Sequence, residues 1–206
     1  MQPPTPSHGS IGAPSSWVAR FAPLVPAGEV LDLACGTGRH ARLFASLSHR
    51  VLAVDRDGAA LAQLAAFGIP GLVTLQIDLE APAQLDGNPD RAGATWPFPA
   101  GRFAAIVVTN YLYRPTLAAI PASLAPGGIL IYETFARGNA RYGKPSNPDF
   151  LLVPDELLQL AQQATPPMQV VAFEQGHVDS PALAVVQRLC AIRPVVGDAA
   201  VAWPRI

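Results

Sequence analysis

Apolar residues along the chain fall into short continuous runs that alternate with segments of mixed polarity. Five of the runs predict buried β-strands, at residues 30–34, 51–55, 72–77, 103–109 and 129–133. Around them, apolar residues recur at helical spacing and predict helices at residues 15–21, 39–47, 57–64, 116–124 and 154–163. Residues 81–100 are rich in Pro and Gly and predict mostly loop.

The alternation of strands and helices predicts a doubly wound, Rossmann-like α/β fold in three layers, with helices on both faces of a mostly parallel sheet. Residues 168–175 and 182–192 are two strand-like runs around a turn that contains Gly and Pro, and they predict a C-terminal antiparallel hairpin. Residues 1–14 are rich in Pro, Ser and Gly and predict a flexible lead-in. Residues 15–206 are expected to form a single domain.

Composition narrows the classes of protein to consider. Of 206 residues, 50% are hydrophobic and 14% are charged, which is typical of strands buried on both faces. The formal net charge is -1 and no basic run occurs, which argues against nucleic acid as a partner. We expect no membrane span, two reduced cysteines (Cys35 and Cys190) and a cytoplasmic location. The oligomeric state stays open.

A glycine loop follows the first predicted strand and opens a helix. Gly36, Gly38 and Ala41 match the dinucleotide-binding pattern G-x-G-x-x-G/A, and Asp55 follows about 20 residues later. Glycines let the backbone approach a ligand, and a carboxylate at that distance accepts hydrogen bonds from ribose hydroxyls. By itself this pattern also fits an NAD(P)-binding oxidoreductase.

Three further features favour S-adenosylmethionine over a dinucleotide. Asp32 lies within the loop motif, where a carboxylate would repel a pyrophosphate but attract the cationic amino-acid end of S-adenosylmethionine. Asp78 and Leu79 end the third strand and offer a carboxylate and a backbone N–H to adenine. A Pro-Gly-Gly turn at residues 126–128 leads into the fifth strand, and a hairpin closes the chain.

Taken in order, residues 30–40, 54–55, 78–79 and 124–128 resemble the motifs of class I S-adenosylmethionine-dependent methyltransferases. The resemblance runs from about residue 15 to about residue 193. The segment 147–158 is also similar to the bacterial tellurite-resistance-type branch. The resemblance implies that residues 15–206 are a methyltransferase domain with S-adenosylmethionine as cofactor and S-adenosylhomocysteine as product.

The resemblance also implies roles at the matching positions. Asp55 would bind the ribose hydroxyls, and Asp78 and Leu79 would bind adenine. The glycine loop and Asn110 would bind the methionine part. The expected cofactor-binding residues are Arg20, Asp32, Ala34, Cys35, Gly36, Thr37, Gly38, Asp55, Arg56, Asp78, Leu79 and Asn110. Each has an ordinary structural alternative, such as a turn residue for Asp78 or a surface ion pair for Arg20.

The acceptor is expected beyond the carboxyl ends of the first and fourth strands, where the strand order of such sheets reverses. Segments 110–114 and 133–135 would form its pocket, with the loop 136–150 as a lid. The expected reaction is an in-line methyl transfer to a small molecule. The candidates are Tyr111, Tyr113 and Glu133 for catalysis, and His40, Tyr111, Tyr113 and Arg114 for acceptor binding.

No His/Cys cluster has metal-ligand spacing, so no metal is expected. Two questions stay open, namely whether the protein is catalytic and which acceptor it uses. A cofactor-binding protein without catalysis is a third alternative beside the methyltransferase and the oxidoreductase. The sequence does not identify the acceptor atom, although the branch resemblance allows a soft oxyanion such as tellurite or selenite.

Overall fold

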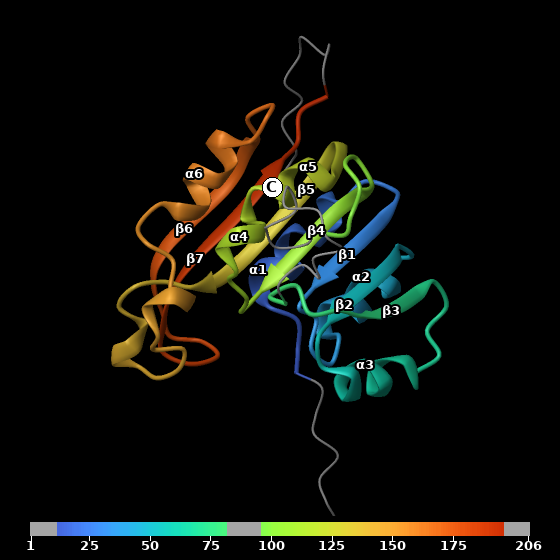
Figure 1. The fold of residues 1–206 in the computed structure, drawn as a ribbon, viewed down its shortest axis with the longest axis horizontal. Helices are drawn as coiled ribbons and strands as arrows, with labels where there is room; N and C mark the ends of the chain where they lie inside the picture. The colour runs from blue at the N-terminus through green and yellow to red at the C-terminus, as the bar shows by residue number, and fades with distance from the viewer. Residues whose placement is uncertain (1–11, 82–95, 196–206) are drawn as a thin grey trace, which may run out of the picture.

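The computed structural model describes residues 12–81 and 96–195 (Figure 1). Within them, a seven-stranded sheet has the order β3-β2-β1-β4-β5-β7-β6. Its strands are β1 (Glu29–Leu33), β2 (Arg50–Asp55), β3 (Leu72–Gln76), β4 (Phe103–Thr109), β5 (Leu124–Phe135), β6 (Gln169–Val178) and β7 (Ala184–Ile192).

Strand directions confirm the predicted mixed sheet. Strands β1 to β5 pair in parallel, whereas β7 pairs antiparallel with both β5 and β6. The predicted hairpin is therefore present, and its second strand lies between β5 and the edge strand β6. The strand order reverses between β1 and β4, as expected. In such sheets this reversal point places the ligand site at the carboxyl ends of β1 and β4.

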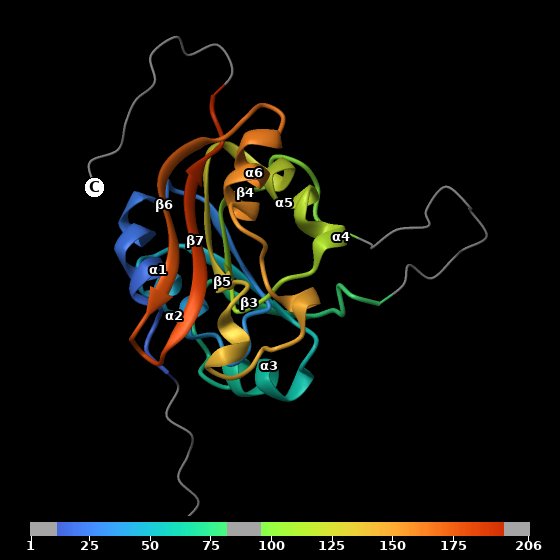
Figure 2. The same ribbon diagram turned by 90° about the vertical axis from the view of Figure 1, so that its left-hand side faces the viewer.

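Helices cover both faces of the sheet and confirm the three layers (Figure 2). One face carries α1 (Ser16–Phe21), α2 (Arg39–Ser46) and α3 (Gly58–Ala65), whose apolar residues pack in one core cluster. The other face carries α4 (Arg114–Leu117), α5 (Ala119–Ser123) and α6 (Glu156–Gln163), which pack in a second cluster. Short 3₁₀ turns occur at Ala22–Leu24 (η1), Asn139–Arg141 (η3) and Pro148–Phe150 (η4).

The central strands are buried on both faces, which explains their continuous apolar runs. In β4, Ile106 and Val108 belong to one core cluster, while Ala105 and Val107 belong to the other. A strand covered on both sides has no solvent-facing position that requires a polar residue. Two of the helices are capped by side chains: Ser15 and Asp57 accept hydrogen bonds from the first turns of α1 and α3.

The helix predicted at 116–124 is present in two pieces, with a break at Ala118 and an earlier end. These pieces are the short helices α4 and α5, and β5 already begins at Leu124, so residues 126–128 lie inside a strand. The end of β7 holds this segment in the sheet: Gly127 N–H donates to the Arg193 carbonyl, and Arg193 N–H donates to the Gly128 carbonyl, each at 2.8 Å. A Cβ on Gly128 would lie 2.8 Å from the Phe103 carbonyl oxygen, so glycine is required there for close strand packing.

Other boundaries differ little from the predictions. The helix expected from residue 154 begins at Glu156, after Asp155 in a left-handed conformation (φ 62°). The loop predicted at 81–100 lies largely outside the described residues, as does the lead-in predicted at 1–14.

Candidate functional site

The glycine loop turns sharply at the carboxyl end of β1. Ala34, Gly36 and Gly38 all have positive φ angles, of 53°, 53° and 75°. A Cβ on Gly38 would lie 2.4 Å from the Leu64 side chain, so this glycine lets α2 start close to α3. A Cβ on Gly36 would meet nothing within 4 Å, so its backbone faces open space. The loop thus has one glycine for packing and one whose backbone is accessible to a ligand.

Asp32 lies beneath this loop, with 1% of its surface exposed. Its Oδ2 accepts a hydrogen bond of 2.8 Å from the Ala41 N–H in the first turn of α2. Burial raises the pKa of this carboxyl to about 7, against the lowering effects of the Ala41 N–H and of nearby Arg39. Asp32 therefore ties β1 to the start of α2 and places a titrating group under the loop.

Asp55 joins the glycine loop to the end of β2. Its Oδ2 accepts from the Gly36 N–H at 2.7 Å, and its Oδ1 accepts from the Asp57 N–H at 2.9 Å. A carboxylate has about four acceptor sites, so both oxygens can still accept bonds from ligand hydroxyls. The two backbone bonds fix the orientation in which Asp55 presents them.

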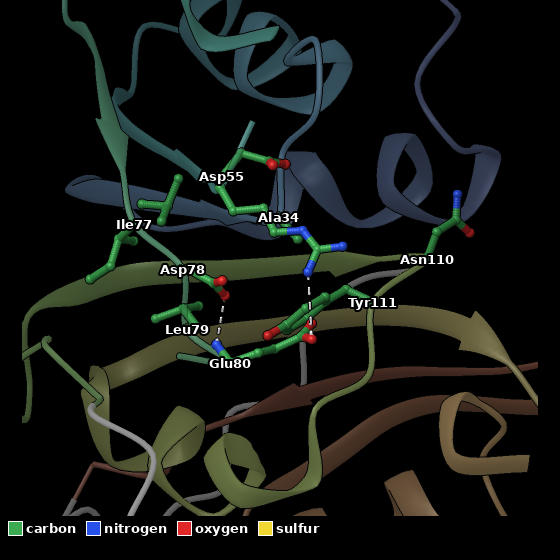
Figure 3. Close-up of a pocket in the computed structure, with 10 residues that line it drawn as sticks. Ala34, Asp55, Ile77, Asp78, Leu79, Glu80, Asn110 and Tyr111 are labelled. Carbon is green, nitrogen blue, oxygen red and sulfur yellow. Dashed lines mark hydrogen bonds and ion pairs between the residues drawn. The ribbon is translucent and has the colours of Figure 1, made fainter. Parts of the chain in front are cut away.

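A cavity of about 240 Å³, here called the smaller cavity, opens beside Asp55 (Figure 3). The carboxyl ends of the first four strands and the residues that follow them line it: Ala34, Val54, Asp55, Arg56, Ile77, Asp78, Leu79, Glu80, Asn110 and Tyr111. The Asp78 side chain accepts from the Glu80 N–H at 2.9 Å, and Glu80 pairs with Arg56 at 3.6 Å. The predicted ribose and adenine residues therefore meet in one place.

The Tyr111 hydroxyl is buried and has no hydrogen-bond partner among the described residues. Burial, with Glu80 and Asp78 nearby, raises the pKa of this phenol above its usual value, so it is neutral at ordinary pH. A buried hydroxyl without a partner is costly, and a bound ligand with a polar edge would satisfy it. The Tyr111 hydroxyl is therefore a neutral group without a partner among the described residues, in a side chain that lines the smaller cavity.

A second, larger cavity has a volume of about 630 Å³. Its walls come from several segments: residues 12–15 before α1 and its first residue Ser16, Arg39, the ends of β4 and β5, the segment 139–144, and the hairpin from Val178 to Arg188. Asn110 lines both cavities. Its φ of 55° is unusual for a residue other than glycine, and its N–H donates to the Glu133 carbonyl at 2.9 Å. Strained backbone of this kind clusters at binding sites.

Glu133 faces the larger cavity but is already paired. The Arg188 Nε lies 2.6 Å from Glu133 Oε2, and another Arg188 nitrogen lies 3.2 Å from Glu174. The side chains of Glu133 and Arg188 are only 12% and 14% exposed. Glu133 is therefore held in an ion pair at the wall of the larger cavity and is not a free carboxylate.

His40 lies under the wall of the larger cavity and is 1% exposed. Its Nε2 accepts from the Ser15 N–H at 3.1 Å, and its Nδ1 lies 3.4 Å from Thr109 Oγ1. Burial, with Arg39 nearby, lowers the pKa of the imidazole to about 3. His40 is therefore neutral and connects the segment before α1 to the end of β4.

The remaining predicted residues do not line either cavity. Arg114 pairs with Glu156 at 2.7 Å and donates to two backbone carbonyls, and Arg20 pairs with Glu174 at 3.7 Å. Tyr113 precedes α4 as its N-cap residue, and Thr37 is exposed. Burial raises the pKa of the Cys35 thiol, which makes it a poor nucleophile.

Sequence reasoning missed several residues of the larger cavity. Ser15 and Ser16 are the N-cap and the first residue of α1, and Leu183 and Arg188 come from the later hairpin, which folds back. Arg188 carried one readable signal, because it is a lone charge within the apolar run 184–192. The others have no local signal, since the folded topology alone brings them to the site.

Residues 12–81 and 96–195 contain no cluster of three or more His, Cys, Asp or Glu that could hold a metal ion. In the same residues, no helix is long and apolar enough to cross a membrane.

Comparison with known proteins identifies the family. Residues 8–181 match a family model described as a methyltransferase domain, and the chain belongs to that family. The predicted identification as an S-adenosylmethionine-dependent methyltransferase is thereby confirmed. The match decides against the oxidoreductase that the glycine loop alone had left open. No curated protein matches the sequence.

Solved structures with the same fold include three that illustrate its range. TehB from Haemophilus influenzae is 17% identical, with a TM-score of 0.64, and the match covers 85% of this chain and 61% of TehB. An S-adenosylmethionine-dependent methyltransferase from Mesorhizobium loti is 15% identical, with a TM-score of 0.63 and coverage of 87% and 99%. The [4+2]-cyclase SpnF is 16% identical, with a TM-score of 0.63 and coverage of 86% and 78%. At these identities the likeness shows the fold.

Proposed function

We propose that this enzyme transfers the methyl group of S-adenosylmethionine to a small-molecule acceptor by in-line displacement. The donor's adenosine part would occupy the smaller cavity, and its methionine part would share the larger cavity with the acceptor. The observation that carries this proposal is that Asn110 lines both cavities at the point where the strand order reverses. The methyl group would then lie beside Asn110.

The smaller cavity suits an adenosine. Asp55, fixed by two backbone N–H groups, would accept hydrogen bonds from the ribose hydroxyls. Leu79 and Ile77 offer apolar contacts to the adenine ring, and Asp78 would accept from its amino group. The unpartnered Tyr111 hydroxyl would gain a partner on the bound ligand.

The methionine part would lie along the glycine loop. The Asp32 carboxyl beneath the loop would interact favourably with the donor's positive charges. Arg39, the first residue of α2, lines the larger cavity and is a better candidate than Arg20 for the donor's carboxylate. Arg20 instead pairs with Glu174 and lies over the Phe21 ring.

Bound S-adenosylmethionine supplies a methyl group already activated by a sulfonium. A lone pair of the acceptor forms the new bond to the methyl carbon, the sulfur–methyl bond breaks, and its electron pair stays on sulfur in the neutral product. The work of the protein is to position the acceptor and exclude water. Tyr111 and His40 are neutral and Glu133 is paired, so an acceptor that must lose a proton would release it to water.

The proposed setting is the cytoplasm. Cys35 and Cys190 are both buried free thiols, which supports a reducing compartment.

Calorimetric titration with S-adenosylmethionine tests the donor site. Asp55→Ala and Gly36→Val are expected to weaken binding at least tenfold, because the first removes the ribose acceptor and the second puts a β-branched residue at a positive φ. Asp149→Ala removes an exposed carboxylate away from both cavities and is the matched control. Circular dichroism confirms that each variant is folded. Unchanged affinity in folded Asp55→Ala would contradict the proposed site.

A further inference from the structure

Four charged side chains line the larger cavity, and their charges do not sum to zero. They are Arg39, Glu133, Lys144 and Arg188. The Glu133–Arg188 pair continues through Glu174 to Arg20, with contacts of 3.2 and 3.7 Å, so these four groups alternate in sign and sum to zero.

Two positive charges are left over after this pairing. Among the described residues, no carboxylate forms an ion pair with Arg39 or Lys144, and Glu133 is the one acidic side chain lining the cavity. Since Arg39 is assigned to the donor's carboxylate, Lys144 is the positive charge that faces the remaining space.

The other walls of this cavity are largely apolar. Phe135 lies at the end of β5, and Val178, Pro181, Leu183 and Val186 come from the hairpin and its turn. Leu183 is 56% exposed at the rim, although a leucine of its size is better buried. An apolar ligand surface resting on Leu183 would remove it from water.

The size of the cavity separates two kinds of anion. Its volume of about 630 Å³ is typical of sites for organic ligands, which run from about 300 to about 1,000 Å³. A bare oxyanion such as tellurite has no apolar surface to place against Phe135 and Leu183.

We infer that the acceptor is an organic acid, with an apolar body against the 178–186 hairpin turn and an anionic group held by Lys144. This inference rests on the proposed function, because it assigns the rest of the cavity to the donor's methionine part. It names the chemical class of the acceptor and leaves its nucleophilic atom open.

A set of matched probes tests the class. The enzyme is first saturated with S-adenosylhomocysteine, and binding of 2-naphthoate is then compared by calorimetry with that of the neutral 2-naphthamide and the cationic 2-naphthylmethylammonium. We expect 2-naphthoate to bind most tightly. Lys144→Gln should lower the preference for naphthoate over naphthamide about two- to fivefold, since an exposed charge contributes modestly. The preference should also shrink with added salt.

Two further variants separate charge from packing. Leu183→Ser should weaken the binding of naphthoate and of naphthamide by the same factor, so the ratio of the two affinities should not change. Arg141→Gln removes an exposed charge on the same segment that does not line the cavity, and it should leave both affinities unchanged.

Three outcomes would overturn the inference. The first is tighter binding of the amide or the amine than of naphthoate. The second is an unchanged preference in Lys144→Gln. The third is release of S-adenosylhomocysteine from S-adenosylmethionine with tellurite or selenite that naphthoate does not inhibit. Titration with S-adenosylhomocysteine alone comes first, because failure at that step would count against the donor site, whereas normal donor binding without anion preference would count against the organic acid alone.

Discussion

The backbone N–H of Ser15 donates a hydrogen bond of 3.1 Å to the Nε2 atom of buried His40. A nitrogen that accepts a hydrogen bond carries no proton, so the neutral imidazole has its proton on Nδ1, which faces Thr109 Oγ1 at 3.4 Å. Thr109 directly precedes Asn110, the residue shared by both cavities. The His40 side chain, on α2, thus positions the segment before α1, which is a wall of the larger cavity, against the end of β4.

Replacing His40 by Ala should loosen the segment before α1. The Ser15 N–H loses its acceptor, and an unsatisfied, partly buried donor costs about 1–3 kcal/mol. We expect faster amide hydrogen exchange at residues 12–19, measured by mass spectrometry. His40→Gln supplies a carbonyl acceptor and should restore part of the protection. Equal exchange in the wild type and in His40→Ala would show that other contacts hold the segment.

The contact between Gly38 and Leu64 predicts a strong coupling between two substitutions. Gly38→Ala places a Cβ 2.4 Å from the Leu64 side chain and should destabilise the fold. Leu64→Ala removes the clash but leaves a cavity that costs about 2–5 kcal/mol. In the Leu64→Ala background, Gly38→Ala should therefore cost much less than in the wild type.

Urea unfolding of the four proteins in this double-mutant cycle measures that coupling. Gly36→Ala is the control, because its Cβ meets nothing within 4 Å and its cost comes from the positive φ alone. It should destabilise the wild type and the Leu64→Ala variant by the same amount. Additive costs for Gly38→Ala and Leu64→Ala would contradict the packing role of Gly38.

Burial of Asp32 predicts an unusual dependence of stability on pH. Its pKa is raised from 3.8 to about 7, so the folded protein binds a proton that the unfolded chain has released between these values. Stability from this group is then present below about pH 4, falls as pH rises to about 7, and is constant above that. The full change is at most about 4 kcal/mol.

Asp32→Asn keeps an oxygen acceptor for the Ala41 N–H but cannot ionise. Chemical denaturation at several pH values should find the variant and the wild type similar at about pH 4 and below, and the variant more stable near pH 8. Parallel curves across this range would show that Asp32 does not titrate as its burial indicates. Donor binding should weaken in the variant, because the negative charge under the loop is lost.

The sequence predicts those site residues that lie directly at the end of a predicted strand. Asp55, Asp78 and Asn110 each end a parallel strand, so strand prediction alone brings them to one edge of the sheet. The walls of the larger cavity do not follow, because Ser15 reaches them through His40 and Leu183 through the antiparallel hairpin. Likewise, helical spacing at 116–124 could not reveal that Arg193 draws residues 127 and 128 into the sheet.

Arg114 shows how a residue chosen for acceptor binding is used elsewhere. Its guanidinium bonds Glu156 at 2.7 and 3.0 Å and the carbonyls of Asp149 and Leu151 at 2.7 and 2.9 Å, so it joins α4 to the segment before α6. Arg114→Ala should lower the free energy of unfolding by about 1–2 kcal/mol while leaving S-adenosylmethionine affinity unchanged.

Arg114→Lys should not recover that stability, because an ammonium cannot reproduce a planar fork that reaches a carboxylate and two carbonyls at once. Thermal unfolding together with calorimetric titration separates the two possible roles. A variant with wild-type stability but weakened binding of a methyl acceptor would indicate that Arg114 binds the acceptor. Lost stability with normal donor and acceptor binding would instead establish that its role is to hold α4 and α6 together.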